Sequence, residues 1–352
     1  MKVALLTIWH VENYGAELQT YATVKALKQL NFDVEVIDFR LSDESKKSLL
    51  GIIASVVQIV SPLKLKFNRF WKKYIPSSRR YKTASDLMEN PPVADIYMVG
   101  SDQVWNPDIT KNRAKIYFLN FVSRDIKHIS YASSFGVAEW KHANLYDDVK
   151  SLLKNFDYVT CREESGVELL KNQFGIDAIN VVDPTLLFAS YPEFVKSPKE
   201  KNNLVFYPLS EDSELEILSQ KVAAILDLNP INNNKVTKLL GRTEWNRNSV
   251  EEWVKNIAES KFVITRSFHG LIFSLLHNKQ FALLKIRNGR NSRVENLLRK
   301  VGLEDRIYDT PEALLSDEPW KRKIDYSVVN PRVANLREES WDVLKSMLAY
   351  ER

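Results

Sequence analysis

The residues best suited to chemistry form one short segment, Arg266-Ser267-Phe268-His269-Gly270, directly after an apolar run. Ser267 is a suitable N-cap, and the N–H groups of a first helical turn attract an anion. Arg266 adds a fixed positive charge, and His269 can move a proton near neutral pH. We therefore interpret this segment as an anion-binding site with an acid–base group, with a histidine in a purely structural role as the alternative.

Further arginines could bind the same anion. Three of them lie between residues 287 and 293, where Asn291 and Arg293 precede a predicted helix. Arg162 lies at the end of a predicted strand, where a guanidinium can bind a carboxylate or phosphate through two hydrogen bonds. The alternatives are a solvated loop for the first group and a surface ion pair with a neighbouring glutamate for Arg162.

Polar and aromatic side chains also follow predicted strands in the first half of the chain. The segment 101–107 combines a carboxylate, amides and an indole ring, a composition that binds sugar hydroxyls and stacks on sugar C–H faces. The segment 13–16 opens a predicted helix whose first turn presents N–H groups to a ligand. For the first segment, a structural turn with Trp105 anchored in the core is the alternative. The side chains that we expect to line this site are Asn13, Tyr14, Gln103, Trp105 and Asn106.

Short apolar runs alternate with helix-period stretches along the chain, which predicts an α/β protein with parallel sheets. The predicted strands are 3–9, 34–39, 95–99, 128–132, 158–161 and 180–182 in the first half, and 204–207, 236–240, 262–265 and 281–285 in the second. The candidate residues follow strands, where ligands bind in such sheets. We expect two Rossmann-like domains that face a central cleft. Their boundaries are 1–197, with a basic helical insertion at about 46–82, and 204–328, followed by a helix at 329–352 that packs back on the first domain.

Composition excludes several classes of protein. A chain of 352 residues is too long for one hydrophobic core and suits two domains. Its ten glycines are widely spaced, with Gly166 and Gly175 the closest pair, so neither the dinucleotide-binding fingerprint nor a P-loop occurs. The single cysteine, Cys161, excludes an internal disulfide and multi-cysteine metal sites, and we expect no metal. We therefore expect a cytoplasmic protein.

The net charge of +5 comes from one part of the chain. Ten lysines and arginines and no acidic residue lie between Lys46 and Lys82, which leaves 40 basic and 45 acidic residues elsewhere. Aromatic rings alternate with lysines here, which suits peripheral contact with the anionic inner face of a membrane through residues 63–82. A solvated helix that covers the domain is the alternative. Nucleic-acid binding is not expected, because the rest of the chain is acidic and carries no recognisable module.

The candidate segments resemble, in the same order, the signatures of the polysaccharide pyruvyltransferases. Gly-Ser-Asp-Gln-x-Trp-Asn-Pro and Ser-Phe-His-Gly form a specific pair, although neither motif would be specific alone. The resemblance covers the chain from residue 3 to about residue 305. The matching stretches are 13–16, 100–107, 130–136, 162–166, 183–185, 267–270 and 291–293.

The resemblance implies a GT-B-like fold, phosphoenolpyruvate as donor and a saccharide as acceptor, and we expect this acceptor to be lipid-linked. The product would be a pyruvate ketal that bridges two sugar hydroxyls of a capsule or exopolysaccharide precursor, and no cofactor is needed. His269 occupies the position of the family's essential histidine. Arg266 matches the Arg-x-x-His form of some members, whereas others have an aspartate there.

On this basis we expect the second half to bind the donor and the first half the acceptor. Arg162, Arg266 and Arg293 would hold the phosphate and carboxylate, together with Ser267 and Gly270 at the helix start and with Asn291. His269 would protonate the donor, and Asp102 would act as the base toward the acceptor. The rival interpretations are a GT-B glycosyltransferase that uses a nucleotide sugar and a non-catalytic carbohydrate-binding protein.

Overall fold

A computed structural model describes residues 1–40, 61–239, 243–287 and 291–349. The chain forms two compact units. Unit 1 comprises Met1–Asp43, Trp71–Phe188 and Ala334–Arg352, and unit 2 comprises Glu44–Phe70 and Ala189–Val333. One unit boundary falls within the helix α3 (Pro62–Tyr74), and another falls within the helix α14 (Tyr326–Leu348). Each of these helices therefore belongs in part to both units.

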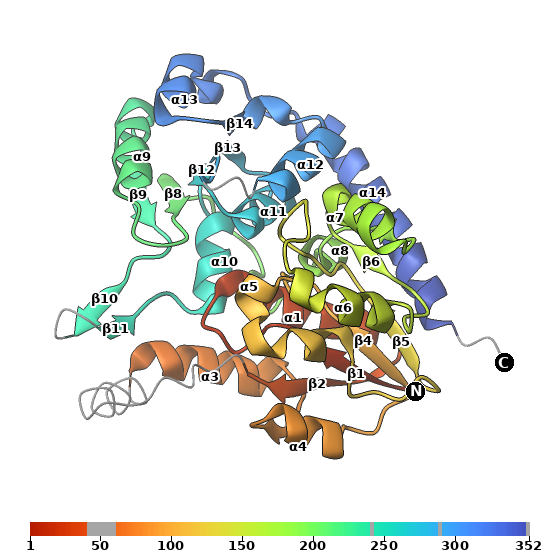
Figure 1. The fold of residues 1–352 in the computed structure, drawn as a ribbon. Helices are drawn as coiled ribbons and strands as arrows, with labels where there is room; N and C mark the ends of the chain where they lie inside the picture. Colours follow the sequence, from red (N-terminus) through yellow and green to blue (C-terminus); the bar gives the residue numbers. More distant parts are fainter. Residues whose placement is uncertain (41–60, 240–242, 288–290, 350–352) are drawn as a thin grey trace. The chain divides into compact units, whose positions relative to one another are not determined.

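Unit 1 is built on a parallel five-stranded sheet with the order β3-β2-β1-β4-β5 (Figure 1). Its strands are β1 (Lys2–Leu6), β2 (Asp33–Phe39), β3 (Ser77–Tyr81), β4 (Ile96–Val99) and β5 (Lys127–Ser130). The central strands are almost entirely apolar because helices and loops cover both faces of a parallel sheet. In β1, for example, Val3 and the three residues after it are fully buried.

The helices of unit 1 connect these strands. They are α1 (Tyr14–Gln29), α4 (Ala84–Glu89), α5 (Pro107–Thr110), α6 (Tyr146–Leu153), α7 (Glu164–Leu169) and α8 (Pro184–Phe188). A short parallel pair, β6 (Thr160–Cys161) and β7 (Ile179–Asn180), continues from β5 through isolated bridges. The loops after β1, β4, β5 and β6 therefore emerge at the same edge of the sheet, and they carry the candidate residues of the first half.

Unit 2 repeats this architecture with the strand order β14-β13-β12-β8-β9, all parallel. Its strands are β8 (Asn203–Tyr207), β9 (Asn229–Asn232), β12 (Phe262–Thr265), β13 (Gln280–Leu284) and β14 (Ile307–Tyr308), with a separate antiparallel pair β10 (Thr237–Leu239) and β11 (Thr243–Asn246). Its helices are α9 (Ser213–Leu226), α10 (Val250–Ala258), α11 (Phe268–Leu276), α12 (Ser292–Val301) and α13 (Pro311–Asp317).

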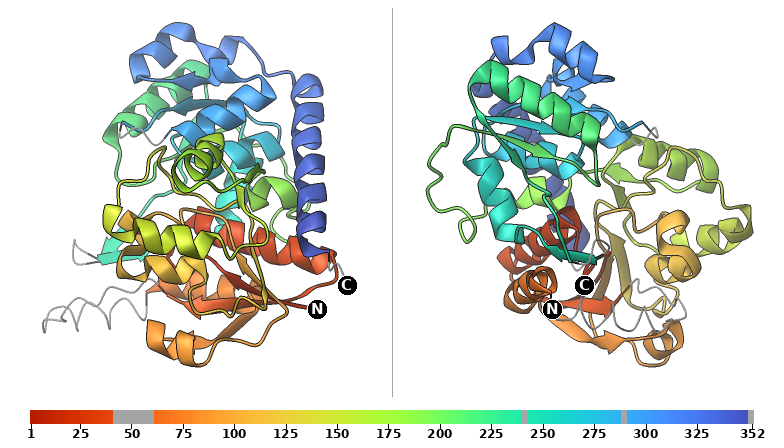
Figure 2. Two further views of the ribbon diagram at one scale, coloured as in Figure 1. Left: turned by 45° about the vertical axis from the view of Figure 1, so that its right-hand side comes forward. Right: turned by 90° about the vertical axis from the view of Figure 1, so that its left-hand side faces the viewer.

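Alternate residues of the unit 2 strands face opposite layers. Leu204, Phe206 and Ile264 pack with the apolar side of α9 and with α13, which lie on one face of the sheet (Figure 2). On the other face, the Tyr207 ring meets the Trp253 ring of α10 edge to face at 5.1 Å. This burial on both sides explains why the strands read as continuous apolar runs in the sequence.

Two sequence-based expectations about strands need correction. Residues 236–240 were expected in the sheet, but Thr237–Leu239 pairs antiparallel with β11 outside it, and β9 occupies the edge position instead. The Asn-Pro-Ile-Asn sequence of β9 carries no apolar alternation, because an exposed edge strand needs little of it. β3 lies within the expected helical insertion and carries Ser-Ser-Arg-Arg-Tyr, which gave no strand signal for the same reason.

Where it is described, the basic segment forms the helix α3, and the strand β3 follows it. In α3, the rings of Phe67, Phe70 and Trp71 are buried, so they are not available to enter a membrane interface. Lys72 and Lys73 at its end are exposed, which matches a solvated helix that covers the protein. The remainder of the expected insertion, 46–60, lies outside the described residues.

Candidate functional site

The segment 266–270 links the end of β12 to the start of α11, as its sequence predicts. Ser267 is the N-cap of α11, and its Oγ accepts a hydrogen bond from the Gly270 N–H at 3.3 Å. A Cβ on Gly270 would lie 2.5 Å from Thr265 Oγ1, so only glycine lets the helix pack this closely on its strand. The positive end of the α11 dipole is thereby held at the carboxyl end of the sheet.

His269 lies in the first turn of α11 and is 8% exposed. The Phe268 ring lies 5.5 Å from the His269 ring at an interplanar angle of 74°. The Arg293 guanidinium lies over the same Phe268 ring at 5.6 Å. The Phe268 ring therefore contacts both the His269 ring and the Arg293 guanidinium at the N-terminal end of α11.

Arg266 is held by carboxylates from the first turn of α9. Its Nε donates to Asp212 Oδ2 at 2.7 Å, and its other nitrogens donate to Glu214 and to the Lys285 carbonyl. Asp212 is also the N-cap of α9, because its Oδ1 accepts from the Leu215 N–H at 3.0 Å. In this structure Arg266 ties the β12–α11 turn to α9, and its charge is compensated.

Asn291 closes the loop between β13 and α12. Its Oδ1 accepts from the Ile286 N–H at 2.8 Å, and its Nδ2 donates to the Ile286 carbonyl at 2.9 Å. The side chain was expected to bind a donor, but both ends of its amide bind this backbone. Its contribution is to hold the loop that leads to Arg293.

Both interpretations of Arg162, as a ligand for the donor anion and as a surface ion pair, need correction. Its side chain has no exposed surface in unit 1. Its guanidinium donates to Asp183 Oδ2 at 3.0 Å and to Asp102 Oδ1 at 3.3 Å, and Glu163 Oε2 lies 3.6 Å from its Nε. Burial alone would lower the pKa of Arg162, but these carboxylates outweigh it and raise the pKa above its ordinary value. The residue is a charged structural centre of unit 1, not a surface ion pair.

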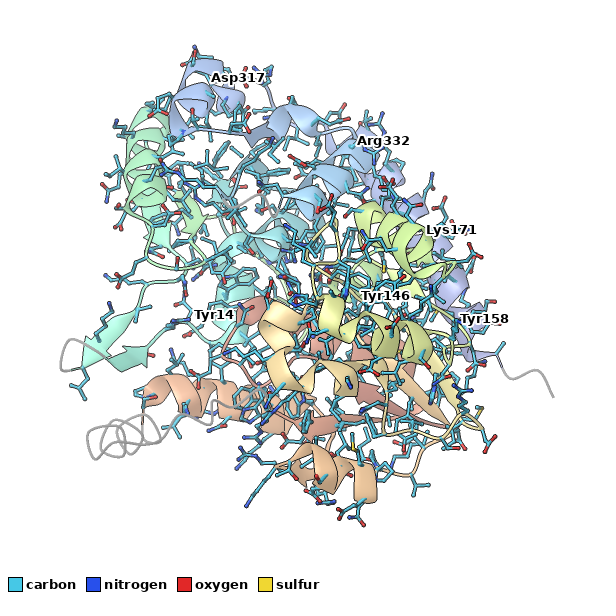
Figure 3. The ribbon with its side chains drawn as sticks, viewed as in Figure 1. Tyr14, Tyr146, Tyr158, Lys171, Asp317 and Arg332 are labelled. Carbon is cyan, nitrogen blue, oxygen red and sulfur yellow. The ribbon has the colours of Figure 1, made fainter. Side chains whose placement is uncertain are left out.

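Trp105 is anchored in the core, which agrees with the alternative interpretation of its loop as a structural turn. The ring is fully buried, stacks on Phe118 at 5.5 Å and donates from Nε1 to the Tyr117 carbonyl at 2.9 Å. No face of the indole is left for a sugar, so the expectation that Trp105 lines an acceptor site is wrong. Tyr14, which is labelled in Figure 3, was expected in the same role. It is 1% exposed, so little of its side chain is left to contact a sugar.

The other polar side chains of this loop shape its turns. Asn106 is the buried N-cap of α5, and its Nδ2 donates to Gln103 Oε1 at 3.1 Å. Gln103 fills the space beside Gly136, where a Cβ would lie 2.1 Å from Gln103 Oε1. Asp102 has a positive φ of 74°, a strained backbone conformation for a residue with a side chain, and it is 21% exposed in its side chain.

The loop between β1 and α1 carries Asn13, which was expected to line the acceptor site. It also contains His10 and lies beside Glu17, two groups that the sequence analysis did not identify. Asn13 is the N-cap of α1, and its Oδ1 accepts from the Ala16 N–H at 3.2 Å. Glu17 is fully buried and accepts hydrogen bonds from the Val11 N–H and from Trp71 Nε1, and burial raises its pKa to about 8. His10 stacks on Trp71 at 3.3 Å, and burial lowers its pKa to about 3. No sequence signal links Trp71 to this loop, because the contact joins residues far apart in the chain.

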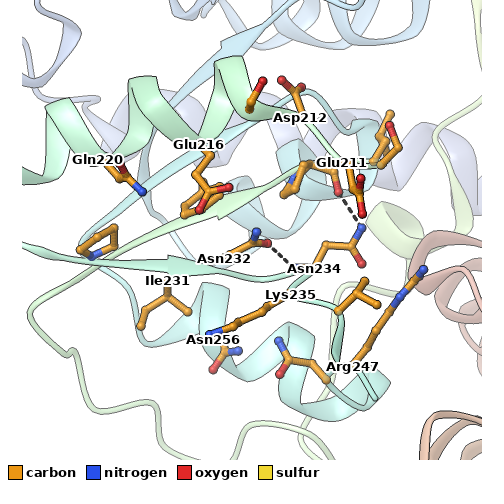
Figure 4. A pocket seen from close by; sticks show the side chains of 18 of the residues that line it. Glu211, Asp212, Glu216, Gln220, Ile231, Asn232, Asn234, Lys235, Arg247 and Asn256 are labelled. Atoms are coloured by element: carbon orange, nitrogen blue, oxygen red, sulfur yellow. Dashed lines mark hydrogen bonds between the residues drawn. The ribbon is translucent and has the colours of Figure 1, made fainter. Parts of the chain in front are cut away.

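Unit 2 also contains a polar pocket of about 1170 Å³ beside α9 and β9 (Figure 4). Asp212, the partner of Arg266, is part of its wall. Within the described ranges, no three His, Cys, Asp or Glu side chains gather closely enough to hold a metal ion. None of the described helices has the length and hydropathy needed to cross a membrane.

Comparisons with known proteins relate the chain to one family and one fold. The family model for polysaccharide pyruvyl transferase matches residues 13–287. A UDP-N-acetylglucosamine 2-epimerase from Rickettsia bellii is similar in structure, with a TM-score of 0.56 and 13% identity over 99% of this chain and 96% of that one. The UDP-GlcNAc 2-epimerase of Methanocaldococcus jannaschii gives a TM-score of 0.51 at 13% identity, over 98% of this chain and 100% of that one. That of Neisseria meningitidis gives 0.50 at 12% identity, over 99% of both chains. These likenesses show the expected GT-B-like fold, and no curated protein matches the sequence.

Proposed function

Because this chain belongs to the polysaccharide pyruvyl transferase family, we propose that it transfers the pyruvyl group of phosphoenolpyruvate to two hydroxyls of a saccharide. The product is a cyclic pyruvate ketal, and phosphate is released. The observation that supports this function best is the cluster at the N-terminal end of α11, where the Phe268 ring contacts both His269 and Arg293.

This cluster has the chemistry that an enol phosphate requires. The donor carries a phosphate and a carboxylate, and the N–H groups of the first turn of α11 attract either one. Arg293 supplies a positive charge that can pair with the other anionic group. Arg266 already pairs with Asp212 and Glu214, so we propose that it positions the turn that carries His269.

In the proposed reaction, His269 protonates the methylene carbon of the donor as the double bond opens, which leaves an oxocarbenium-like centre at C2. The first saccharide hydroxyl adds to C2 and loses its proton. The second hydroxyl then attacks C2, the bond from C2 to the phosphate oxygen breaks, and phosphate leaves with the electron pair. Asp102 takes the proton of one hydroxyl and passes it to phosphate or solvent, and the proton of the other hydroxyl restores the imidazolium.

Asp102 is the proposed base on the acceptor side. Its carboxylate is partly exposed and is oriented by the Gln103 N–H at 2.9 Å and by Arg162. The family implies a saccharide acceptor, and our proposal is that this saccharide belongs to a surface polysaccharide precursor.

The test is a release assay with defined donors and acceptors. Phosphoenolpyruvate is mixed with lipid-linked galactose, mannose, glucose or N-acetylated acceptors, and free phosphate and product mass are measured. We expect phosphate release only with a competent acceptor, together with the mass increase of one ketal. No release with any of these acceptors would contradict the proposal.

A nucleotide-sugar glycosyltransferase is the second candidate, because the structural likeness to proteins named as UDP-GlcNAc 2-epimerases fits a nucleotide-sugar ligand as well. The same assay separates the two functions. UDP release from a UDP-sugar, without phosphate release from phosphoenolpyruvate, would favour the second candidate.

A further inference from the structure

We infer that the pocket beside α9 and β9 binds a neutral oligosaccharide, namely the part of the acceptor chain that lies beyond the sugar being modified. The role in acceptor binding rests on the proposed function, whereas the pocket itself is argued from its size, charge and polar groups. All of its lining residues belong to unit 2.

The size of the pocket fits an extended ligand. Its volume of about 1170 Å³ exceeds the roughly 300–1000 Å³ that is usual for pockets of small ligands. A three-carbon donor such as phosphoenolpyruvate would leave most of it unfilled. The pocket therefore suits a ligand built of several sugar residues.

The charges around the pocket are balanced. Three acidic side chains (Glu211, Asp212 and Glu216) face three basic ones (Lys235, Lys238 and Arg247). Several of these charges are already paired, since Lys238 binds Glu211 and Arg266 binds Asp212. Because these charges balance, the lining offers no surplus of positive charge to compensate the phosphates of a nucleoside diphosphate, and it therefore favours a neutral ligand.

Side-chain amides make up much of the remaining polar lining, and amides can both donate to and accept from sugar hydroxyls. They are Gln220, Asn232, Asn234, Asn248 and Asn256 (Figure 4). Two of them are oriented by Asn233, which is fully buried: its Oδ1 accepts from Asn248 Nδ2 and Asn256 Nδ2, each at 2.9 Å. This part of the wall is therefore held in place before a ligand binds.

Asn234 gives the most specific indication of a ligand. The residue is 8% exposed, and its Nδ2 donates to the Pro208 carbonyl at 2.9 Å. Its Oδ1 is buried, yet it accepts no hydrogen bond from any residue in the described part of the chain. A buried carbonyl oxygen without a donor is unfavourable, and a ligand hydroxyl at this wall of the pocket would supply the donor.

The position of the pocket connects it to the proposed reaction. Asp212 lies in its wall and also binds Arg266, which precedes the α11 turn that carries His269. An oligosaccharide in the pocket would thus extend from the neighbourhood of the donor site. In this arrangement the pocket would select acceptors by the length of the sugar chain and by the type of sugar. This selection would be separate from the recognition of the two reacting hydroxyls.

The test uses the full chain and substitutions of Gln220, which is exposed on α9, so we expect the variants to fold normally. Binding of neutral gluco-, galacto- and manno-oligosaccharides, from disaccharide to hexasaccharide, is measured by calorimetry and saturation-transfer NMR without donor. We expect at least one to bind, Gln220→Ala to weaken its binding about fivefold through one lost hydrogen bond, and Gln220→Trp to weaken it more than tenfold by filling the pocket. Gln29→Ala and Gln29→Trp are the matched controls, because Gln29 is an exposed helical glutamine of unit 1.

Three results would overturn the inference: no binding of any of these oligosaccharides, binding unchanged in Gln220→Trp, or displacement of the bound oligosaccharide by UDP. Binding in the absence of donor keeps this test apart from that of the proposed function. If the chain binds an oligosaccharide at Gln220 but releases no phosphate from phosphoenolpyruvate, the inference about the pocket stands and the proposed reaction is contradicted. If the chain releases phosphate and the KM for the acceptor is unchanged in Gln220→Trp, the proposed reaction stands and the inference about the pocket is contradicted.

Discussion

At the scale of single residues, His269 and Arg162 show how the same structural features can lead to opposite roles. Both follow a buried strand at the carboxyl end of a parallel sheet. His269 lies at a helix start with a cation on the neighbouring ring, whereas the guanidinium of Arg162 is surrounded by carboxylates. The first arrangement suits chemistry on an anion, and the second stabilises a fold.

We expect His269→Ala to lower turnover by about two to four orders of magnitude, because a general acid contributes that much. Phosphate release from phosphoenolpyruvate with acceptor measures the effect, and the melting temperature confirms that the variant is folded. His142→Ala, at a partly exposed histidine of unit 1, should keep normal turnover. Normal turnover in the His269 variant would remove this residue from the mechanism.

We expect Arg162→Met to lower the free energy of unfolding by about 3–5 kcal/mol, because it leaves buried carboxylates without their cation. Urea unfolding measures the change. Arg79→Met is the matched control, since Arg79 pairs with Asp86 on the exposed surface of the same unit and should leave stability nearly unchanged. Equal effects of the two substitutions on the free energy of unfolding would show that the buried network stabilises the fold no more than an exposed ion pair.

At the scale of elements, the turn between β1 and α1 depends on a contact with α3. Glu17 of α1 accepts hydrogen bonds from the Val11 N–H of the turn and from Trp71 of α3. His10 and Glu12 in this turn have φ values of 63° and 55°, which side chains rarely adopt. The buried carboxyl group therefore helps to hold a strained turn next to the Asn13 N-cap.

This contact predicts a pH dependence of stability. The folded-state pKa of Glu17 is raised to about 8 by burial, above its ordinary value of 4.5. Its favourable contribution is therefore complete below pH 4.5 and is lost as the pH rises through 8, where the buried carboxyl must ionise. We expect the melting temperature to fall over this interval, and to fall less steeply in Glu17→Gln.

Glu89→Gln, at the exposed end of α4, is the control for that measurement and should keep the wild-type pH profile. An identical profile in Glu17→Gln would contradict the assignment. His10 does not confuse the result above pH 6.5, since burial lowers its pKa to about 3 and its effect on stability appears only at lower pH.

At the scale of the whole molecule, the described residues form two five-stranded parallel sheets with different kinds of polar residues at their carboxyl ends. Unit 1 presents capped turns and an internal charge network. Unit 2 presents the α11 turn, Arg293 and a large polar pocket. The proposed donor site in unit 2 rests on the α11 turn and Arg293, and the pocket belongs to the inferred acceptor subsite.

We expect Arg293→Met to weaken the binding of phosphoenolpyruvate about tenfold or more, because a hydrogen bond to a charged group is lost. Calorimetry with phosphoenolpyruvate alone measures this. Arg79→Met, in unit 1, should leave the affinity unchanged. Loss of affinity in both variants would show that the effect is not specific to the α11 turn.

Much of the fold follows from local sequence patterns. Apolar runs predicted most strands, and the Arg-Ser-Phe-His-Gly segment predicted the N-cap at Ser267, because caps and periodicity depend on residues close together in the chain. The edge strands β3 and β9 were missed, since edge strands carry little of the apolar pattern. The family membership was also readable from the order of the motifs.

The roles of individual polar side chains depended on contacts between distant parts of the chain. Arg162 meets Asp183 and Asp102, and Arg266 meets Asp212, only because particular strands are neighbours in each sheet. The sequence by itself determined the α/β elements, their caps and the residues at the carboxyl ends of the strands. Only the tertiary structure decided which of those residues are neutralised in the interior and which remain at the start of α11, because burial and charge pairing are set by packing between elements.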